Sequence, residues 1–547
     1  MDDSLRSPAR YQFPLARTLS WGCLLLFALL SAAHAEDLLW PLGGEKSITG
    51  GFADTRPDHF HGGLDIHTGP EHLPVMAPAD GWIERIQIVP PGYGHVLYFR
   101  LPDGRTAVFG HLDHFNPVLE KMMRDSQLVT GSCSVDLLFD KPAPERQFQR
   151  GDVLAYTGHS GAGPAHFHYE IREGAVQTDP LLYYGPHDNQ PPKILSVRWT
   201  TLSDFSPSDI GQPILGGGGK KGRRAPGGNA ISASAPVAFF VQAYDPGPWG
   251  RNATPYVMRV KVDGLPVYED TTGRINLAGP RNIYEKTVWP FKSGKHNDLW
   301  RLFDEPAPPE YQDSARDGRG WLSHLNHADV TIEIGDRGGN VTAAHFTVTS
   351  GAWPRVTPKP LPREIRIGEF CLDTKSDPVA AWARITELGS DEISIGPAGF
   401  AFSGKTKLCH CLRDLERKQG AFVYERGGKS IRAQWPSLSE AGDTLSCQIL
   451  RGGIYGVGFD HEPPLLTLSA KGDRLGFHLT DDLSGVDYTA LRCTVDGLTA
   501  IADFEFEERG GDIWTRQPLN RGAHEISFTA ADRAGNSRTW HETVMLR

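Results

Sequence analysis

The sequence predicts a mainly β protein made of several domains. At 547 residues the chain is too long for one hydrophobic core, and about three or four domains are expected. It contains 61 glycines and 41 prolines, which favour many short strands and turns over long helices. Short runs of β-branched and aromatic residues, bounded by turn residues, recur along the chain. Together these observations indicate β-sheets built largely from hairpins.

Residues 1–35 have the features of an export signal. Three arginines precede an apolar run at 21–30, and a small-residue site, A-H-A, ends at Ala35. The apolar run is short for a membrane span, so cleavage after Ala35 is expected in preference to an uncleaved anchor. No later segment is apolar enough to cross a bilayer. The mature chain is therefore expected to be exported, to the periplasm or cell envelope or as a secreted protein.

The charge of the chain argues against a general nucleic-acid binder. The net charge is −10, and removing the signal, with its three arginines and two acids, leaves about −11. The basic run G-G-G-G-K-K-G-R-R at 216–224 is a local exception. A solvated, flexible loop is the favoured interpretation of this run, and contact with an anionic polymer is the alternative.

Six cysteines remain after removal of the signal. In an oxidising compartment some of them are expected to pair, although the sequence does not select the pairing. The C-H-C run at 409–411 is spaced more tightly than the two-residue gap of structural zinc sites. A disulfide or free thiols are therefore favoured over a metal site. The six are Cys133, Cys371, Cys409, Cys411, Cys447 and Cys493.

Residues 38–185 form the first predicted domain, and their sequence pattern is typical of β-hairpins. β-Branched and aromatic residues are concentrated in short segments that turn residues separate. Between 115 and 150 lies an insertion of mixed helical and loop character. The predicted strands cover 82–89, 95–101, 106–112, 153–157 and 166–171.

Two later segments, 189–350 and 461–547, share one order of signals. Each begins near a Pro-Pro pair, passes a V-D-G-L turn (262–265 and 495–498), and ends in a D-R-x-G-N turn (336–340 and 532–536). This order resembles bacterial immunoglobulin-like repeats, which implies β-sandwiches that end in a hairpin; two unrelated β-domains are the alternative. The first copy carries two apparent inserts, the basic loop and residues 275–320. A proline-rich linker at 351–363 leads to a further small β-domain at 364–460.

Three short stretches of the first domain carry its candidate chemistry. In H-F-H-G-G-L-D-I-H (59–67), His61 and Asp65 are four residues apart, but Gly62-Gly63 makes a helix improbable. The glycine pair instead allows a sharp turn through which the imidazole and the carboxylate converge. Imidazole nitrogen and carboxylate oxygen are ligands that suit zinc.

The other two stretches supply further histidines. V-F-G-H-L-D places His111 at the end of a predicted strand. In G-P-A-H-F-H-Y-E-I-R (163–172), His166 and His168 share one face of a strand, while Phe167 faces the core. A pair of surface histidines is the alternative interpretation of that last stretch taken alone.

Taken together, the three stretches resemble the M23 family, the lysostaphin/LytM-type zinc metallopeptidases. The family pattern H-x-x-x-D, x-H-L and H-x-H is matched at 61–65, 110–112 and 166–168, and supporting motifs extend the match over about 45–185. The resemblance implies an antiparallel β-sheet domain and one Zn²⁺ per chain, bound by His61, Asp65 and His168. It also implies that His111 and His166 are catalytic histidines that do not bind the metal.

The chain departs from the family pattern near His111. Gly110 stands where alanine is frequent, Phe109 replaces the usual tyrosine, and His95 follows Gly94 where asparagine is frequent. None of these changes removes a metal ligand. The insertion after His111 is close in sequence to the site, which leaves the substrate preference open. Further histidines are expected to be solvated or structural, namely His59, His67, His72, His114 and His159.

The resemblance implies an exported zinc metalloendopeptidase that hydrolyses peptide crosslinks of cell-wall peptidoglycan. There is no H-E-x-x-H motif and hence no obvious glutamate base, so His166 is the candidate general base and His111 the candidate for stabilising an oxyanion or shuttling a proton. The downstream β-domains would position this unit or bind wall polymer or an envelope protein. The alternatives are a catalytically silent binding or regulatory protein, and a zinc endopeptidase acting on proteins such as glycine-rich segments.

Overall fold

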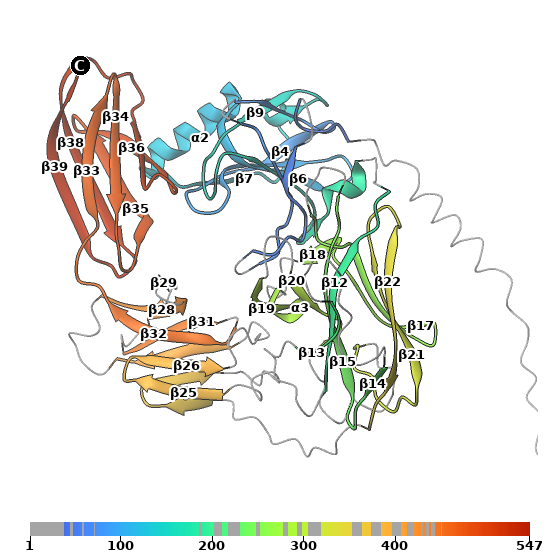
Figure 1. Cartoon of the computed structure of the whole chain (residues 1–547). Coiled ribbons are helices and arrows are strands. Elements are labelled where there is room, and N and C mark those ends of the chain that lie inside the picture. Colours follow the sequence, from blue (N-terminus) through green and yellow to red (C-terminus); the bar gives the residue numbers. More distant parts are fainter. Residues whose placement is uncertain are drawn as a thin grey trace, which may run out of the picture.

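Figure 1 shows a computed structural model of the chain. The residues that the structure describes are 38–43, 47–56, 59–69, 72–184, 189–201, 211–216, 230–247, 252–276, 283–292, 298–304, 319–352, 364–373, 384–396, 406–412, 420–427, 430–433, 437–438, 443–449 and 451–547. The predicted export signal lies outside these residues.

The prediction of a mainly β, multi-sheet protein is confirmed, because nearly all described elements are strands (Figure 1). The N-terminal unit is built on an antiparallel sheet with the central strand order β1-β2-β10-β6-β5-β4-β7. Its elements are β1 (Ile48–Gly50), β2 (Leu64–Ile66), β3 (Pro74–Met76), β4 (Gly81–Val89), β5 (Gly94–Arg100), β6 (Thr106–Phe115), α2 (Pro117–Thr130), β7 (Val135–Leu138), η1 (Pro144–Arg146), β8 (Gln147–Phe148), β9 (Val153–Thr157), β10 (Phe167–Glu173), β11 (Val176–Thr178) and η2 (Pro180–Tyr183).

The five strands predicted for this unit are present as β4, β5, β6, β9 and β10. Strand β10 begins one residue later than predicted, so His166 lies immediately before it. Phe167 is fully buried, as its position in the pattern predicts, and it packs in one core with Phe109 and Tyr169. The rings of Phe109 and Tyr169 stack with centroids 5.7 Å apart, which fixes β6 against β10.

The insertion after His111 contains one helix and short strands. Asn116 caps α2 by accepting a hydrogen bond from the Leu119 amide, and Gly131 ends the helix in the left-handed region with φ +64°. Beyond the helix, β7 pairs with β4 at the edge of the sheet. The stretch predicted as a mixture of helix and loop therefore contains a capped helix, after which the chain rejoins the sheet as β7.

Residues 193–349 contain two five-stranded sheets, and a large apolar core and a smaller apolar cluster lie among them. The strand orders are β13-β12-β15-β20-β19 and β14-β22-β21-β16-β17, and β18 instead pairs with β11 of the N-terminal unit. The part of the basic loop after Gly216 lies outside the described residues. The elements are β12 (Lys193–Thr201), β13 (Gln212–Gly216), β14 (Ala230–Ser232), β15 (Val237–Tyr244), β16 (Val257–Val262), β17 (Leu265–Thr271), β18 (Arg274–Asn276), α3 (Ile283–Lys286), β19 (Thr287–Lys292), β20 (Asp298–Arg301), β21 (Ala328–Gly335) and β22 (Val341–Thr349).

The next unit also has two five-stranded sheets, and it holds the disulfide. Cys371 on β24 is bonded to Cys409 on β27, and the two residues are register partners on neighbouring strands. Cys133, Cys411, Cys447 and Cys493 are free thiols. The strands are β23 (Glu364–Ile367), β24 (Phe370–Asp373), β25 (Arg384–Gly389), β26 (Glu392–Gly396), β27 (Lys407–Cys411), β28 (Ala421–Gly427), β29 (Ser430–Ala433), β30 (Ser437–Leu438), β31 (Thr444–Gln448) and β32 (Gly453–Phe459).

The C-terminal β unit is a seven-stranded arrangement in the order β33-β34-β37-β36-β35-β38-β39. Figure 1 shows that the chain turns back here, so that β36 lies beside α2 of the N-terminal unit. The strands are β33 (Leu465–Lys471), β34 (Arg474–Thr480), β35 (Val486–Val495), β36 (Leu498–Glu505), β37 (Gly510–Trp514), β38 (Gly522–Asp532) and β39 (Ser537–Leu546).

The two D-R-x-G-N turns close matching hairpins, β21–β22 and β38–β39. In each, the asparagine amide donates to the aspartate carboxylate four residues earlier, at 2.8 Å for Asn340 to Asp336 and for Asn536 to Asp532. The two V-D-G-L segments also form hairpin turns, with positive φ at Asp263 and at Asp496. The predicted repeat is thus matched in its local turns, while the immunoglobulin-like assignment stays a prediction.

Within the described part of the chain, no helix is both long and apolar enough to cross a membrane.

The stacked core predicts a large effect of Phe109→Ala. Phe109 is fully buried, so truncation leaves a cavity between β6 and β10 and should lower the local stability of this sheet by about 3–5 kcal/mol. Hydrogen exchange resolved by mass spectrometry should show faster exchange in β5, β6 and β10. The control is Leu138→Ala, whose side chain is 70% exposed and should cost less than about 0.5 kcal/mol. Equal protection in both variants would contradict the role of Phe109 in holding these strands.

Candidate metal centre

The candidate site is organised by the register of three neighbouring strands. Asp65 on β2 lies directly opposite His168 on β10, and His168 in turn lies opposite Gly110 on β6. Residues that are partners on adjacent strands place their side chains close together on one face of the sheet. Cross-strand pairing thus joins two sequence stretches that are about a hundred residues apart.

His61 joins this pair from the segment that enters β2. Its backbone is fixed by two hydrogen bonds of 2.8 Å, one from its amide to the Asp54 carbonyl and one from the Ala53 amide to its carbonyl. The chain bends at Gly63 as it enters β2, and the imidazole and the carboxylate converge as predicted, but neither glycine has the positive φ that would itself require glycine. They permit a close approach instead, because a Cβ on Gly63 would lie 2.3 Å from the Tyr169 carbonyl oxygen.

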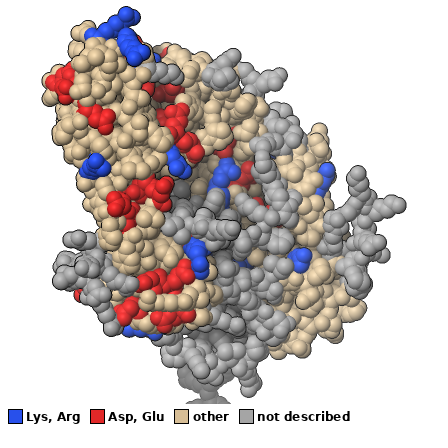
Figure 2. Space-filling model, turned by 60° about the vertical axis from the view of Figure 1, so that its left-hand side comes forward, with Lys and Arg blue, Asp and Glu red and all other residues tan. Residues whose placement is uncertain are grey.

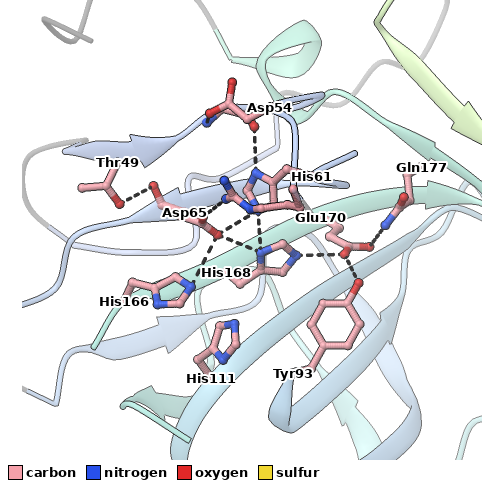
Figure 3. A network of polar contacts seen from close by, with 12 residues as sticks. Thr49, Asp54, His61, Asp65, Tyr93, His111, His166, His168, Glu170 and Gln177 are labelled. Carbon is pink, nitrogen blue, oxygen red and sulfur yellow. Dashed lines mark hydrogen bonds and ion pairs between the residues drawn. The ribbon is translucent and has the colours of Figure 1, made fainter. Parts of the chain in front are cut away.

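Three side chains converge on one point (Figure 3). Asp65 Oδ1 lies 2.8 Å from His61 Nε2 and 3.0 Å from His168 Nδ1, and the two nitrogens are 3.1 Å apart. The site is nearly closed to solvent, with 6%, 14% and 5% of the side chains of His61, Asp65 and His168 exposed. The structure therefore brings together the three residues predicted to bind a metal.

Backbone and side-chain acceptors orient the two imidazoles toward this point. His61 Nδ1 lies 2.7 Å from the Gly51 carbonyl oxygen, which can only accept, so Nδ1 carries the proton and Nε2 presents its lone pair. His168 Nε2 lies 2.8 Å from Glu170 Oε1, which leaves Nδ1 facing Asp65 and His61. Such acceptors behind the ligands fix the ring orientation and the tautomer that a metal requires.

Glu170 is a functional residue for which the sequence analysis predicted no role. It is fully buried, and its carboxylate also accepts hydrogen bonds from Tyr93, from Arg172 at 2.6 Å and from Gln177 at 2.9 Å. The H-F-H-Y-E stretch could have indicated this role, since Glu170 is two residues after His168 and therefore faces the same side of β10.

His111 and His166 lie together at the side of the three converging residues (Figure 3). Their ring centroids are 4.2 Å apart, and His166 Nε2 is 3.5 Å from Asp65 Oδ1. Each Nδ1 faces a backbone carbonyl, that of Ser160 at 2.7 Å for His111 and that of Pro164 at 2.6 Å for His166. In their neutral forms both rings therefore carry the proton on Nδ1 and a lone pair on Nε2.

His111 occupies an unusual backbone conformation. It has φ +57° where the pairing of β6 with β5 shifts register, between the partner pairs Leu97–Phe109 and His95–Leu112. A non-glycine residue in this region costs free energy that the surrounding structure must supply. The preceding residue is also constrained, because a Cβ on Gly110 would lie 3.2 Å from the Tyr93 ring and 3.4 Å from the His168 Cβ. Glycine at 110 thus allows β6 to lie close to His168.

The charges of the site are strongly coupled. Burial opposes ionisation of Asp65, yet the charge of His61 and hydrogen bonds from His166 and His168 hold the pKa of its carboxyl well below the usual range. Burial lowers the pKa of His111 to about 3, and His166 and His168 add to this shift. Burial also acts to lower the pKa of His168, but its contacts with Asp65 and Glu170 outweigh this and raise the pKa to about 9.

The other histidines of the unit make different contacts. His59 and His67 are exposed, and His72 and His114 contact Asp113 at 3.3 Å and 2.6 Å. The His95 ring lies 3.0 Å from the Asp113 carbonyl oxygen. Their side chains are not among the groups that converge on Asp65 within the described residues.

The donor set fits zinc. Two imidazole nitrogens and one carboxylate oxygen lie within 4.8 Å of one another, so small shifts of the side chains allow all three to contact one ion. Three protein ligands leave a fourth tetrahedral position open, which is the arrangement of catalytic rather than structural zinc sites.

Comparison with known proteins gives similar solved structures only. No family model and no curated protein matches the chain. The catalytic domain of the prophage-encoded M23 protein EnpA from Enterococcus faecalis is 20% identical over 28% of this chain and 100% of that chain, with a TM-score of 0.20. A zinc-containing peptidase from Vibrio cholerae is 22% identical over 24% and 35%, with a TM-score of 0.18. The catalytic domain of lysostaphin from Staphylococcus simulans is 17% identical over 25% and 91%, with a TM-score of 0.19.

At these identities and TM-scores, the comparisons do not assign a function to this chain.

Removal of one ligand should abolish tight metal binding. His168→Ala leaves only two donors, so the affinity for zinc should fall by at least about 100-fold, as measured by competition with a chromophoric chelator. His72→Ala is the matched control, because that ring is more than half exposed and contacts Asp113 instead. Unchanged affinity in His168→Ala would show that the metal binds elsewhere.

Zinc binding should also release a proton. In the metal-free chain the pKa of His168 is raised to about 9, so the ring is protonated at neutral pH and zinc must displace that proton. The apparent affinity should rise about tenfold per pH unit between pH 6 and 8. Calorimetric titration in buffers of different ionisation enthalpy should give about one proton released at pH 7. Zinc binding without proton release would mean that His168 is already neutral.

Proposed function

We propose that this chain is an exported zinc metalloendopeptidase that hydrolyses peptide crosslinks of cell-wall peptidoglycan. The observation that carries the proposal is the convergence of His61, Asp65 and His168, with two further histidines beside them. The resemblance of the sequence motifs to M23 peptidases supports the substrate class, and the pattern of residues 1–35 supports export.

A zinc ion held by these three residues would polarise the scissile carbonyl and lower the pKa of a water molecule toward about 7. The chain itself supplies the proton transfers. His166 is the best placed base, because its Nε2 is unprotonated in the neutral ring and lies beside Asp65. It can take a proton from the attacking water and give it to the leaving amine, so that His166 is unprotonated again after each turnover.

The surroundings of His111 favour one of the two roles predicted for it. Since its Nδ1 proton faces the Ser160 carbonyl oxygen, the neutral ring of His111 offers only a lone pair at Nε2. A group of this kind accepts or relays a proton and cannot donate to an oxyanion without first being protonated. We therefore assign His111 to proton relay with His166, whose ring lies 4.2 Å away.

The test of the proposal is digestion of purified peptidoglycan sacculi by the zinc-loaded chain that begins at residue 36. Mass analysis of the released fragments should identify a cleaved peptide crosslink, and a chelator should stop the release. A glycine-rich polypeptide incubated in parallel distinguishes a protein substrate from wall material. A fully zinc-loaded chain that cleaves neither would instead favour a binding or regulatory protein.

His166→Ala should separate metal binding from turnover. Its ring lies at the side of the site and is not required to hold the ion, so zinc content should remain at one per chain. Without the base, kcat should fall by about 10²–10⁴-fold. His72→Ala is again the control and should keep both properties. Turnover in His166→Ala equal to that of the unaltered chain would remove His166 from the mechanism.

A further inference from the structure

The C-terminal β unit (β33–β39) contacts the N-terminal unit on two surfaces, although about 280 residues separate them in the chain. One surface is the helix α2 of the insertion after His111, beside which β36 lies in Figure 1. The other is the turn at 158–164, which leads into His166.

The contact at α2 is held by a partly buried charge. Arg124 donates to Asp503 on β36 at 2.6 Å, and its guanidinium lies 5.1 Å from the centre of the Trp514 ring on β37. Both charged side chains are about four-fifths buried, at 20% and 18% exposure. A second ion pair joins Arg516 to Asp125 at 3.3 Å.

Apolar packing continues across the same boundary. Cys133, two residues beyond the end of the helix region at Gly131, is 2% exposed and belongs to the core of the C-terminal β unit. Leu128 packs against that core as well. The two units therefore share a hydrophobic core, which distinguishes this boundary from a loose surface contact between domains.

The end of β36 and the acidic turn that follows it reach the turn at 158–164. Glu505 Oε2 accepts from the Gly161 amide at 3.4 Å, and Glu507 Oε1 accepts from the Gly163 amide at 2.9 Å. Gly161 and Gly163 both have positive φ, and in this turn conformation their amides donate to the two glutamates of the C-terminal β unit. Glu508 lies 3.3 Å from His159 at the start of the same turn.

This turn holds both candidate catalytic histidines. The Ser160 carbonyl accepts from His111 Nδ1, and the Pro164 carbonyl accepts from His166 Nδ1. The turn also packs closely on its inner side, where a Cβ on Gly161 would lie 2.4 Å from the Gly92 carbonyl oxygen. A displacement of the turn would therefore move the two acceptors that orient His111 and His166.

We propose that the C-terminal β unit completes the active site, with Glu505 and Glu507 acting as positioning residues for His111 and His166 through the turn at 158–164. This inference rests on the proposed function, and it adds that the peptidase site needs the C-terminal β unit of the same chain. The insertion after His111 has a role in this arrangement, because its helix provides the surface on which the C-terminal β unit docks.

The test compares three double variants of the full chain. Glu505→Ala with Glu507→Ala removes both acceptors, whereas Glu505→Gln with Glu507→Gln keeps a carbonyl oxygen that can accept the same amides. Acidic side chains form clusters on the face in Figure 2, so a loss of charge could by itself change contact with a charged polymer. Asp473→Ala with Glu542→Ala is the matched control, since it removes two exposed acids elsewhere in the C-terminal β unit.

The alanine pair should lower kcat by about 10–100-fold with KM and zinc content unchanged, because a small displacement of reacting groups suffices for such a loss. The glutamine pair should stay within about threefold of the unaltered chain, as should the control. Hydrogen exchange should be faster at 158–166 in the alanine pair only. Unaltered kcat and unaltered exchange in the alanine pair would overturn the inference.

If the unaltered chain binds zinc but cleaves no substrate, the proposed function fails. The exchange measurement then still decides whether Glu505 and Glu507 hold the turn.

Discussion

The arrangement of the candidate site depends on one constraint, the antiparallel register that sets His168 against Asp65 on one side and against Gly110 on the other. Cross-strand partners are fixed by the whole ladder, so Asp65 and His168 cannot separate without breaking the sheet. The stacked rings of Phe109 and Tyr169 hold the same strands from the core side. A candidate metal site built in this way is held in place by the sheet before any ion binds, and pre-organised ligands are what a catalytic metal site requires.

The histidine rings of the candidate site are oriented by groups that lie outside the set of His61, Asp65 and His168. Glu170 fixes the ring of His168, and backbone carbonyls fix His61, His111 and His166. Two of these carbonyls belong to a turn whose amides are held by the C-terminal β unit. The site therefore depends on packing between units distant in the sequence, as well as on the sheet beneath it.

Much of the site could be predicted from the sequence, because spacing in a strand determines the face of a side chain. By that rule, the two-residue spacing of His166 and His168 predicts that they share one face, and that Phe167 between them faces the core, where it is buried. The role of Gly63 was not predictable, since close approach to Tyr169 depends on a strand far along the chain. The ion pair between Arg124 and Asp503 was likewise not predictable, because the hydrophobic pattern of neither segment indicates a contact with the other.

The most direct test of the central claim is X-ray absorption spectroscopy of the zinc-loaded chain. Binding by His61, Asp65 and His168 predicts a shell of nitrogen and oxygen at about 2.0–2.2 Å with the outer scattering of two imidazoles. A shell that contains sulfur would place the ion at cysteines instead. That result, or a shell without imidazole, would contradict zinc binding by these three residues.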